Sequence, residues 1–208
     1  MIEIQNLEFK INSQIVFKDI SLHINKPEII KISGRNGSGK TSFLKCIIGL
    51  NSNFSGNLKI NGVDYEDKNK YLTQNRELIS FLLNTPPLYP NFTILENIQI
   101  FNQYLLQKQT PDYIEDLIEK FKLLEFKNVK AGKLSAGNQQ KLGIIICFLK
   151  DCNYYLLDEP IKNLDEESVF IFYEFVKNNF KERSKTYLIV SHQDELLSNL
   201  ATHNLLFN

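Results

Sequence analysis

The eight residues GRNGSGKT at positions 34–41 constrain the fold of this chain more than any other stretch. They fit the phosphate-loop pattern G-x-x-x-x-G-K-[ST], which binds nucleotide phosphates when it joins a β-strand to an α-helix. Residues 28–33 alternate apolar side chains as a strand does, and residues 41–50 repeat them at helical spacing. The motif therefore occurs in the context that phosphate binding requires, which argues against a plain glycine-rich turn with a solvated lysine.

The residue types in this loop suit a triphosphate. Glycines let backbone N–H groups approach a phosphate without an intervening Cβ, and a helix that starts near Gly39 adds the positive end of its dipole. We predict that Lys40 contacts the β- and γ-phosphates and that the Thr41 hydroxyl binds Mg²⁺. The residues predicted to bind nucleotide here are Gly34, Arg35, Asn36, Gly37, Ser38, Gly39, Lys40, Thr41 and Ser42.

The composition is that of a globular protein of one large domain or of a core with an inserted subdomain. The chain has 208 residues, of which 43% are hydrophobic and 23% charged, and its formal net charge is zero. A neutral chain has no overall field that would attract nucleic acid or an anionic membrane, so we expect no nucleic-acid partner. Its apolar runs are too short to cross a bilayer, so we expect no direct membrane span.

Three cysteines, Cys46, Cys147 and Cys152, lack the spacing of a disulfide framework or a metal site. The first two lie in apolar helical runs, which favours buried free thiols. The N-terminal residues alternate like a strand and lack the layout of a signal peptide. Together these features predict a reducing, cytoplasmic compartment.

The pattern of predicted elements changes twice along the chain. Residues 2–32 predict antiparallel strands, and residues 57–62 predict another strand after the first helix. A wholly helical stretch follows, and then buried strands alternate with helices, which predicts a doubly wound α/β core. We therefore place the core and its β subdomain at residues 1–79 and 136–208, and an inserted helical subdomain at residues 80–135. The later predicted elements are helices at 139–150 and 166–180 and strands at 154–157, 186–190 and 203–207.

Two adjacent carboxylates follow the buried strand at residues 154–157. The C-terminal ends of such strands are where parallel sheets bind ligands. Asp158 can hold Mg²⁺ through water, and Glu159 can orient an attacking water as general base. Without the phosphate loop upstream, a carboxylate pair that caps the next helix would be an equal interpretation.

A third motif, LSAGN at residues 134–138, stands directly before a helix. With it, the chain resembles the nucleotide-binding subunit of ATP-binding-cassette (ABC) transporters along essentially its whole length. LSAGN is similar to the family signature LSGGQ, and the order and spacing of the motifs also fit. The other matching segments are Asp158-Glu159-Pro160 for the second Walker motif, Asn163-Leu164-Asp165 for the D-loop and Ser191-His192 for the switch histidine.

The resemblance implies a P-loop NTPase with a RecA-like core, an antiparallel β subdomain and an inserted α-helical subdomain. It implies an ATPase that uses ATP and Mg²⁺, with Lys40, Glu159 and His192 as its catalytic residues. It also implies a head-to-tail pair, in which Ser135 and Gly137 of one chain grip the γ-phosphate held by the other and Asp165 belongs to the same interface. Ser135 alone would be interpreted as a plain helix N-cap.

The sequence departs from the family pattern at several positions. Asn84 stands where the family has the glutamine of its Q-loop, so its side chain is one methylene shorter for reaching Mg²⁺. Ile11 stands where an aromatic ring stacks on adenine, and we expect Phe9, two residues away on the same strand face, to be able to substitute. The signature has Ala136 for Gly and Asn138 for Gln, which are mild changes.

We expect an ATPase subunit that powers a membrane transporter, most consistent with an exporter. Its partners would be a membrane permease and a second ATPase subunit, identical or different, at the inner face of the cell membrane. The helical insert and the loop at residues 84–90 would dock the permease, although Leu88, Tyr89 and Phe92 could instead be internal core. The segment at residues 88–93 resembles that of short bacterial exporter ATPases. Because the chain stops soon after His192, we expect it to lack the C-terminal regulatory domain of many importer ATPases.

Several functional alternatives stay open. The length and the signature also resemble the haem-exporter ATPase of cytochrome c maturation, and a drug, peptide or bacteriocin exporter is equally consistent. A soluble ABC ATPase that acts on ribosomes, DNA or iron–sulfur assembly is a different class. A nucleotide switch that does not hydrolyse ATP is disfavoured by Glu159.

Overall fold

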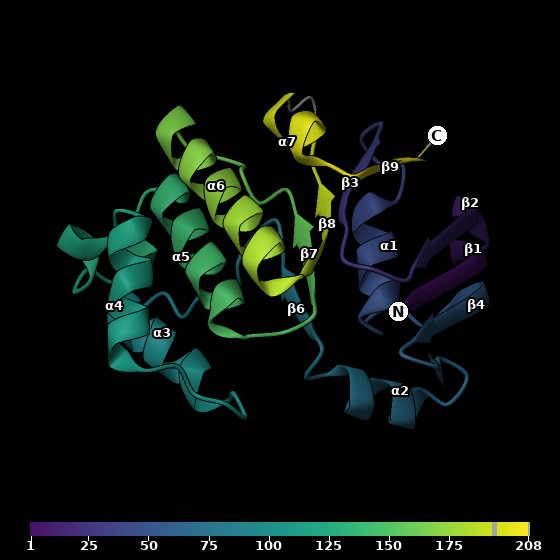
Figure 1. Ribbon diagram of the computed structural model, residues 1–208, viewed down its shortest axis with the longest axis horizontal. Helices are drawn as coiled ribbons and strands as arrows, with labels where there is room; N and C mark the ends of the chain where they lie inside the picture. Colours follow the sequence, from purple (N-terminus) through teal and green to yellow (C-terminus); the bar gives the residue numbers. More distant parts are fainter. Residues whose placement is uncertain (193–194, 208) are drawn as a thin grey trace.

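The computed structural model describes residues 1–192 and 195–207, whose strands form two sheets (Figure 1). The antiparallel sheet has the strand order β2-β1-β4-β5, and the parallel sheet has the order β6-β7-β8-β3-β9. The antiparallel strands are β1 (Ile2–Ile11), β2 (Gln14–Ile24), β4 (Phe54–Ile60) and β5 (Val63–Asp64). The parallel strands are β3 (Ile29–Gly34), β6 (Ile79–Leu82), β7 (Tyr154–Asp158), β8 (Thr186–Val190) and β9 (His203–Phe207).

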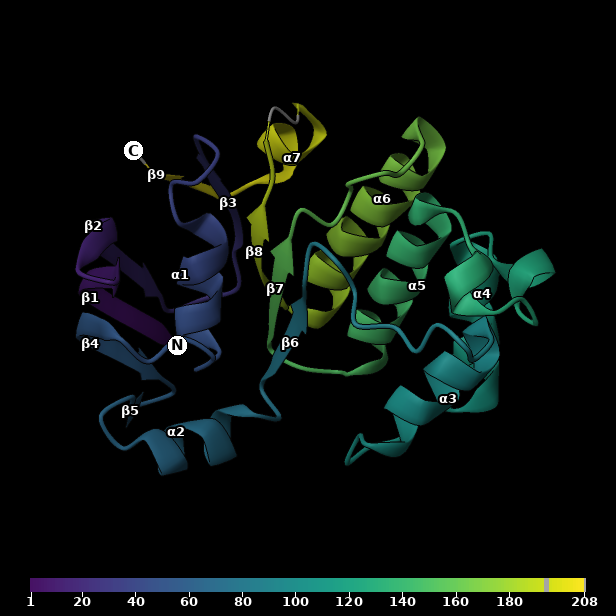
Figure 2. The same ribbon diagram turned by 180° about the vertical axis from the view of Figure 1, so that it is seen from behind.

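The parallel sheet is buried on both faces because its central strands carry apolar residues at almost every position. Every residue of β7 and β8 is buried. Leu156 and Leu188 pack with helix α1 (Lys40–Ile47) and the antiparallel sheet. Leu157 and Ile189 point the opposite way, towards helices α5 (Ala136–Leu149) and α6 (Glu166–Arg183). The doubly wound α/β core predicted from the sequence is thereby confirmed (Figure 2).

A helical region lies against α5, on the side of the molecule away from the antiparallel sheet. It contains α3 (Ile94–Gln103), α4 (Pro111–Lys120) and two short 3-10 turns, η1 (Leu124–Phe126) and η2 (Ala131–Lys133). Thr93 and Glu96 form the predicted capping box at the start of α3, and Thr110 caps α4. Among the described residues, every helix falls short of the length and apolar character that a bilayer-crossing helix requires.

Strand β6 differs from the sequence expectation, and helix α2 (Lys68–Asn75) was not among the predicted elements. We expected a helical subdomain from residue 80, but β6 pairs in parallel with β7, so residues 80–82 belong to the core sheet. Local pattern gave a weak signal for this strand because it has four residues and includes Ser80, whose hydroxyl donates to the Cys147 carbonyl on α5. Cys46 and Cys147 are buried and free, as predicted, and Cys152 is buried and free as well.

The order of the strands brings distant segments to one edge of the parallel sheet. β3 and β7 both pair with β8, and all three run in the same direction. Their C-terminal ends therefore lie side by side. The phosphate loop follows β3, Glu159 follows β7, and His192 follows β8. The last helix, α7 (Glu195–Leu200), leads into the edge strand β9.

Candidate functional site

A cavity of about 540 Å³ opens where the phosphate loop meets the turn between β1 and β2. It collects three segments that the sequence analysis predicted to be functional: the loop itself, Glu159 and His192. The residues that line it are Ile11, Asn12, Gln14, Ile15, Val16, Asn36, Gly37, Gly39, Lys40, Thr41, Ser42, Glu159 and His192.

The phosphate loop has the backbone that an anion cradle needs. Gly37 and Gly39 have φ values of 80° and 93°, which residues other than glycine rarely adopt. A Cβ on Gly39 would lie 2.8 Å from side-chain atoms of both Phe17 and Val16, so only glycine fits between the loop and β2. Helix α1 begins at the next residue, and Lys40, Thr41 and Ser42 of its first turn line the cavity, so the free N–H groups of the helix start lie at the cavity wall.

Two polar groups of the loop fit a phosphate ligand. The Ser38 hydroxyl is buried without a hydrogen-bond partner among the described residues. Lys40 is almost buried as a residue, and its ammonium donates to the carbonyls of Gly34 and Arg35 at 3.0 and 2.7 Å. These acceptors are neutral, and burial lowers the pKa of Lys40 against the opposing effect of Glu159 and Asp158. An anion in the cavity would stabilise the charged ammonium.

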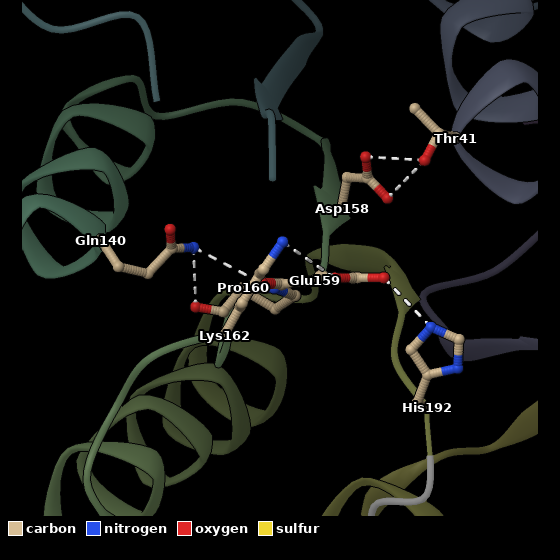
Figure 3. A network of polar contacts seen from close by, with 7 residues as sticks. All are labelled: Thr41, Gln140, Asp158, Glu159, Pro160, Lys162 and His192. Atoms are coloured by element: carbon tan, nitrogen blue, oxygen red, sulfur yellow. Dashed lines mark hydrogen bonds and ion pairs between the residues drawn. The ribbon is translucent and has the colours of Figure 1, made fainter. Parts of the chain in front are cut away.

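Thr41 and Asp158 form a hydrogen-bonded pair beside the loop. The Thr41 hydroxyl lies 3.0 and 2.9 Å from the two carboxylate oxygens of Asp158, which is fully buried (Figure 3). Burial raises the pKa of Asp158, and the hydrogen bond from Thr41 opposes that change. A hydroxyl and a carboxylate suit Mg²⁺, which prefers few protein ligands together with phosphate oxygens. Within residues 1–192 and 195–207, no cluster of three or more His, Cys, Asp or Glu side chains could hold a metal by itself.

The Glu159 side chain is directed into the cavity by an unusual backbone. Its φ is 50°, in the left-handed region, and its N–H donates to the Val190 carbonyl at 3.0 Å. One carboxylate oxygen lies 3.1 Å from His192 Nε2, and the other lies 3.9 Å from Lys162 Nζ. Non-glycine residues with such a backbone cluster at functional sites, where the surrounding structure holds them.

Ser135, Gly137 and Asp165 lie outside the cavity of their own chain. Ser135 is exposed and caps α5 by accepting from the Asn138 N–H at 3.2 Å. A Cβ on Gly137 would lie 2.7 Å from the Asn163 carbonyl oxygen, so α5 packs closely on the D-loop. Asp165 caps α6, and hydrogen bonds from Ser168 are the main reason why its pKa is lowered. Their action on a partner's nucleotide stays a prediction.

The prediction that Phe9 could stack on adenine is wrong. Phe9 is 5% exposed and stacks on Phe17 inside the core, with ring centroids 5.8 Å apart. Ile11 shares its strand face but lies beyond the edge of that core, is 51% exposed and lines the cavity. Ile15 and Val16 of β2 also line the cavity and were not predicted from the sequence, since alternation marks a strand without showing what either face contacts.

Asn84 follows β6 by two residues, at the same sheet edge as Asp158, and is half-buried. It is not among the residues that line the cavity. Its proposed reach to Mg²⁺ therefore stays a prediction.

Separate substitutions at positions 9 and 11 test the prediction that Ile11, which lines the cavity, lies against the adenine. We expect Ile11→Tyr to tighten ATP binding about 2- to 10-fold, because an aromatic contact contributes roughly 0.5–1.5 kcal/mol. Phe9→Leu, which keeps the core apolar, should leave the dissociation constant within about twofold of the original. Isothermal titration calorimetry measures both. Weaker binding by Phe9→Leu with no gain from Ile11→Tyr would restore Phe9 as the adenine contact.

The comparisons with known proteins agree with this geometry. A family profile described as "ABC transporter" matches residues 17–162. The cytochrome c biogenesis ATP-binding export protein CcmA of Haemophilus influenzae is 28% identical, over 98% of this chain and 94% of that protein. The glutamine transport ATP-binding protein GlnQ of Bacillus subtilis is 31% identical, over 93% of this chain and 81% of that protein.

A solved structure of similar fold is the ATP-binding cassette MJ0796, in a dimeric post-hydrolysis state bound to ADP and Pi. It matches with a TM-score of 0.85 and 23% identity, over 100% of this chain and 94% of that chain. The likeness extends over the whole fold described above.

Proposed function

Because this chain belongs to the ABC transporter family of ATP-binding ATPases, we propose that it hydrolyses Mg–ATP in the described cavity to power a membrane exporter. The observation that carries the proposal is the meeting of Lys40, Glu159 and His192 at one cavity, with Thr41 bonded to the buried Asp158 beside it. These groups come from the ends of neighbouring parallel strands, where ligands bind in such sheets.

The proposed role of each residue follows from its place. The loop N–H groups and Lys40 hold the β- and γ-phosphates, and Thr41 with Asp158 would hold Mg²⁺, which neutralises phosphate charge when bound. Glu159 orients the attacking water and accepts its proton, and His192, whose Nε2 lies 3.1 Å from the Glu159 carboxylate, holds that carboxylate in place. Water activation and phosphate binding thus fall to different parts of the cavity.

We propose that two chains pair head to tail around their nucleotides. The start of α5 supports this arrangement, since Ser135 is exposed and lies outside its own cavity. A 14-residue helix presents free N–H groups and its positive dipole end at that point. A partner's γ-phosphate would satisfy these groups. The second chain is a copy of the first or a related subunit.

The export direction and the peripheral position at the inner face of the cell membrane are parts of the same proposal. CcmA is named as an export protein, whereas GlnQ is named for glutamine transport, so the names alone do not decide direction. The haem-exporter type is supported by the match to CcmA over nearly the full length of both chains. The neutral net charge disfavours a nucleic-acid partner.

A groove between the helical region and β6 is the proposed permease-docking surface. Its volume is about 270 Å³, and its apolar wall includes Leu88, Phe101 and Tyr104. Tyr104 is 72% exposed, so a partner that covered it would remove most of an apolar ring from water. Tyr89 and Phe92, near the groove in sequence, are partly exposed as well, at 42% and 44%, so they are not wholly internal core.

A pull-down with a variant of this groove tests the transporter assignment. Tagged chain captured from detergent-solubilised membranes should retain an integral membrane protein, identified by mass spectrometry. Tyr104→Glu should lose most of that protein, on the order of 10-fold, because a buried carboxylate without a partner is strongly unfavourable. Its basal ATPase rate should stay unchanged. Leu206→Glu, which places the same charge at an exposed leucine of β9, is the matched control. Recovery of ribosomes or a soluble scaffold in place of a membrane protein would contradict the proposal.

A further inference from the structure

Gln140 connects the start of α5 to the turn that carries Glu159. Its side chain is buried, with 2% exposure, and its amide nitrogen donates to the Pro160 carbonyl at 2.9 Å and, at a longer 3.5 Å, to the Glu159 carbonyl (Figure 3). It does not line the nucleotide cavity. Gln140 therefore contacts the backbone of the general base from outside the cavity.

The turn at Glu159 needs such support. A φ of 50° is unfavourable for a non-glycine residue and persists only when the surrounding structure holds it. The following proline adds a restriction, since its ring limits the conformations of the residue before it. Gln140 supplies a buried hydrogen-bond donor at this position, and the N–H of Lys162 donates to the Glu159 carbonyl at 3.1 Å. The direction of the Glu159 carboxylate depends on this backbone.

Gln140 is part of a continuous contact between α5 and residues 159–165. Gly137 meets the Asn163 carbonyl so closely that a Cβ would lie 2.7 Å from it. The largely buried Lys141 ammonium lies 3.7 Å from the Asp165 carboxylate. Gly137, Gln140 and Lys141 are spaced i, i+3 and i+4, so they occupy one face of the helix. The start of α5 and residues 159–165 therefore pack against each other along this face of the helix.

We propose that Gln140 is a positioning residue for Glu159, and that it transmits engagement of Ser135 with the partner's nucleotide to the general base of the same chain. The second half of this statement rests on the proposed function above, because it requires a partner nucleotide. In a pair of chains, Ser135 of one chain then contacts the ATP bound to the partner, and Gln140 links that contact to Glu159 of the same chain, which acts on the chain's own ATP.

Kinetics of matched variants test the positioning role. Gln140→Met keeps the length of the side chain and removes the donor; we expect kcat to fall about 10- to 100-fold, as misplacing a reacting group does, with the ATP dissociation constant within twofold. Gln139→Met is the control, because Gln139 Nε2 makes a similar bond, of 3.0 Å, to the Ala131 carbonyl away from the Glu159 turn. It should keep kcat within twofold. Equal losses in both variants, or a loss confined to KM, would overturn the positioning role.

Mixed dimers with two affinity tags test in which chain Gln140 acts. The reference dimer pairs wild type with Glu159→Gln, which leaves one working site. Placing Gln140→Met on the Glu159→Gln chain should leave the reference rate unchanged, because the working glutamate keeps its own Gln140. Placing it on the other chain should lower the rate at least 10-fold. The reverse order, or an equal loss in both arrangements as misfolding would give, overturns the inference. A wild-type chain that neither pairs nor hydrolyses ATP would instead count against the proposed function.

Discussion

Replacing Glu159 with glutamine is expected to lower ATP turnover by about 10²- to 10⁴-fold, the usual contribution of a general base, while ATP binding stays within about twofold. The amide has the size of the carboxylate and can still contact His192, which lies 3.1 Å away. It cannot accept the proton of the attacking water. Because Glu159 is separate from the phosphate loop, the affinity for ATP should change little, and the ATP-bound pair of chains should accumulate.

Phosphate release, calorimetry and size-exclusion chromatography with ATP measure these three properties of Glu159→Gln. Glu182→Gln, which removes one exposed carboxylate from the far end of α6, is the control and should behave as wild type. A Glu159→Gln chain that turns over ATP at the normal rate would show that another group serves as base.

Replacing Ser135 with aspartate should reduce turnover by about 10²-fold or more, since a like charge placed in an interface costs several kcal/mol. Aspartate and asparagine cap a helix as well as serine does, so α5 should stay folded in either variant. They differ in charge while having nearly the same shape. Only the aspartate would face a partner's γ-phosphate with a negative charge, so Ser135→Asn should keep far more activity than Ser135→Asp.

Nucleotide binding to the single chain should be the same in both variants of Ser135, because this residue lies outside its own cavity. ATP-dependent dimerisation, measured in the Glu159→Gln background, should be lost with aspartate and retained with asparagine. Thermal unfolding checks that the helix cap is intact. If both variants hydrolyse ATP equally well, the serine does not act across an interface.

Short-range chemistry explains most of what could be predicted from the sequence. Gly37 and Gly39 adopt the positive φ values that the loop pattern requires, and Thr93 and Glu96 form the capping box at the start of α3. The continuous apolar run before Asp158 became a strand buried on both faces. In each case the residues that decide the structure are within a few positions of one another, so the pattern is visible along the chain.

The sequence by itself determined the phosphate loop, the buried strands, the carboxylate pair Asp158-Glu159 at the end of one of them, the helix starts and the α/β class of the fold. Tertiary structure alone decided that Ile11 and not Phe9 lines the cavity, that β6 joins the parallel sheet, and that Gln140 holds the Glu159 turn. The physical reason is distance along the chain. These outcomes depend on how two sheets and a helix far apart in sequence pack together, and an alternating or helical pattern shows which residues share a face without showing what that face will contact.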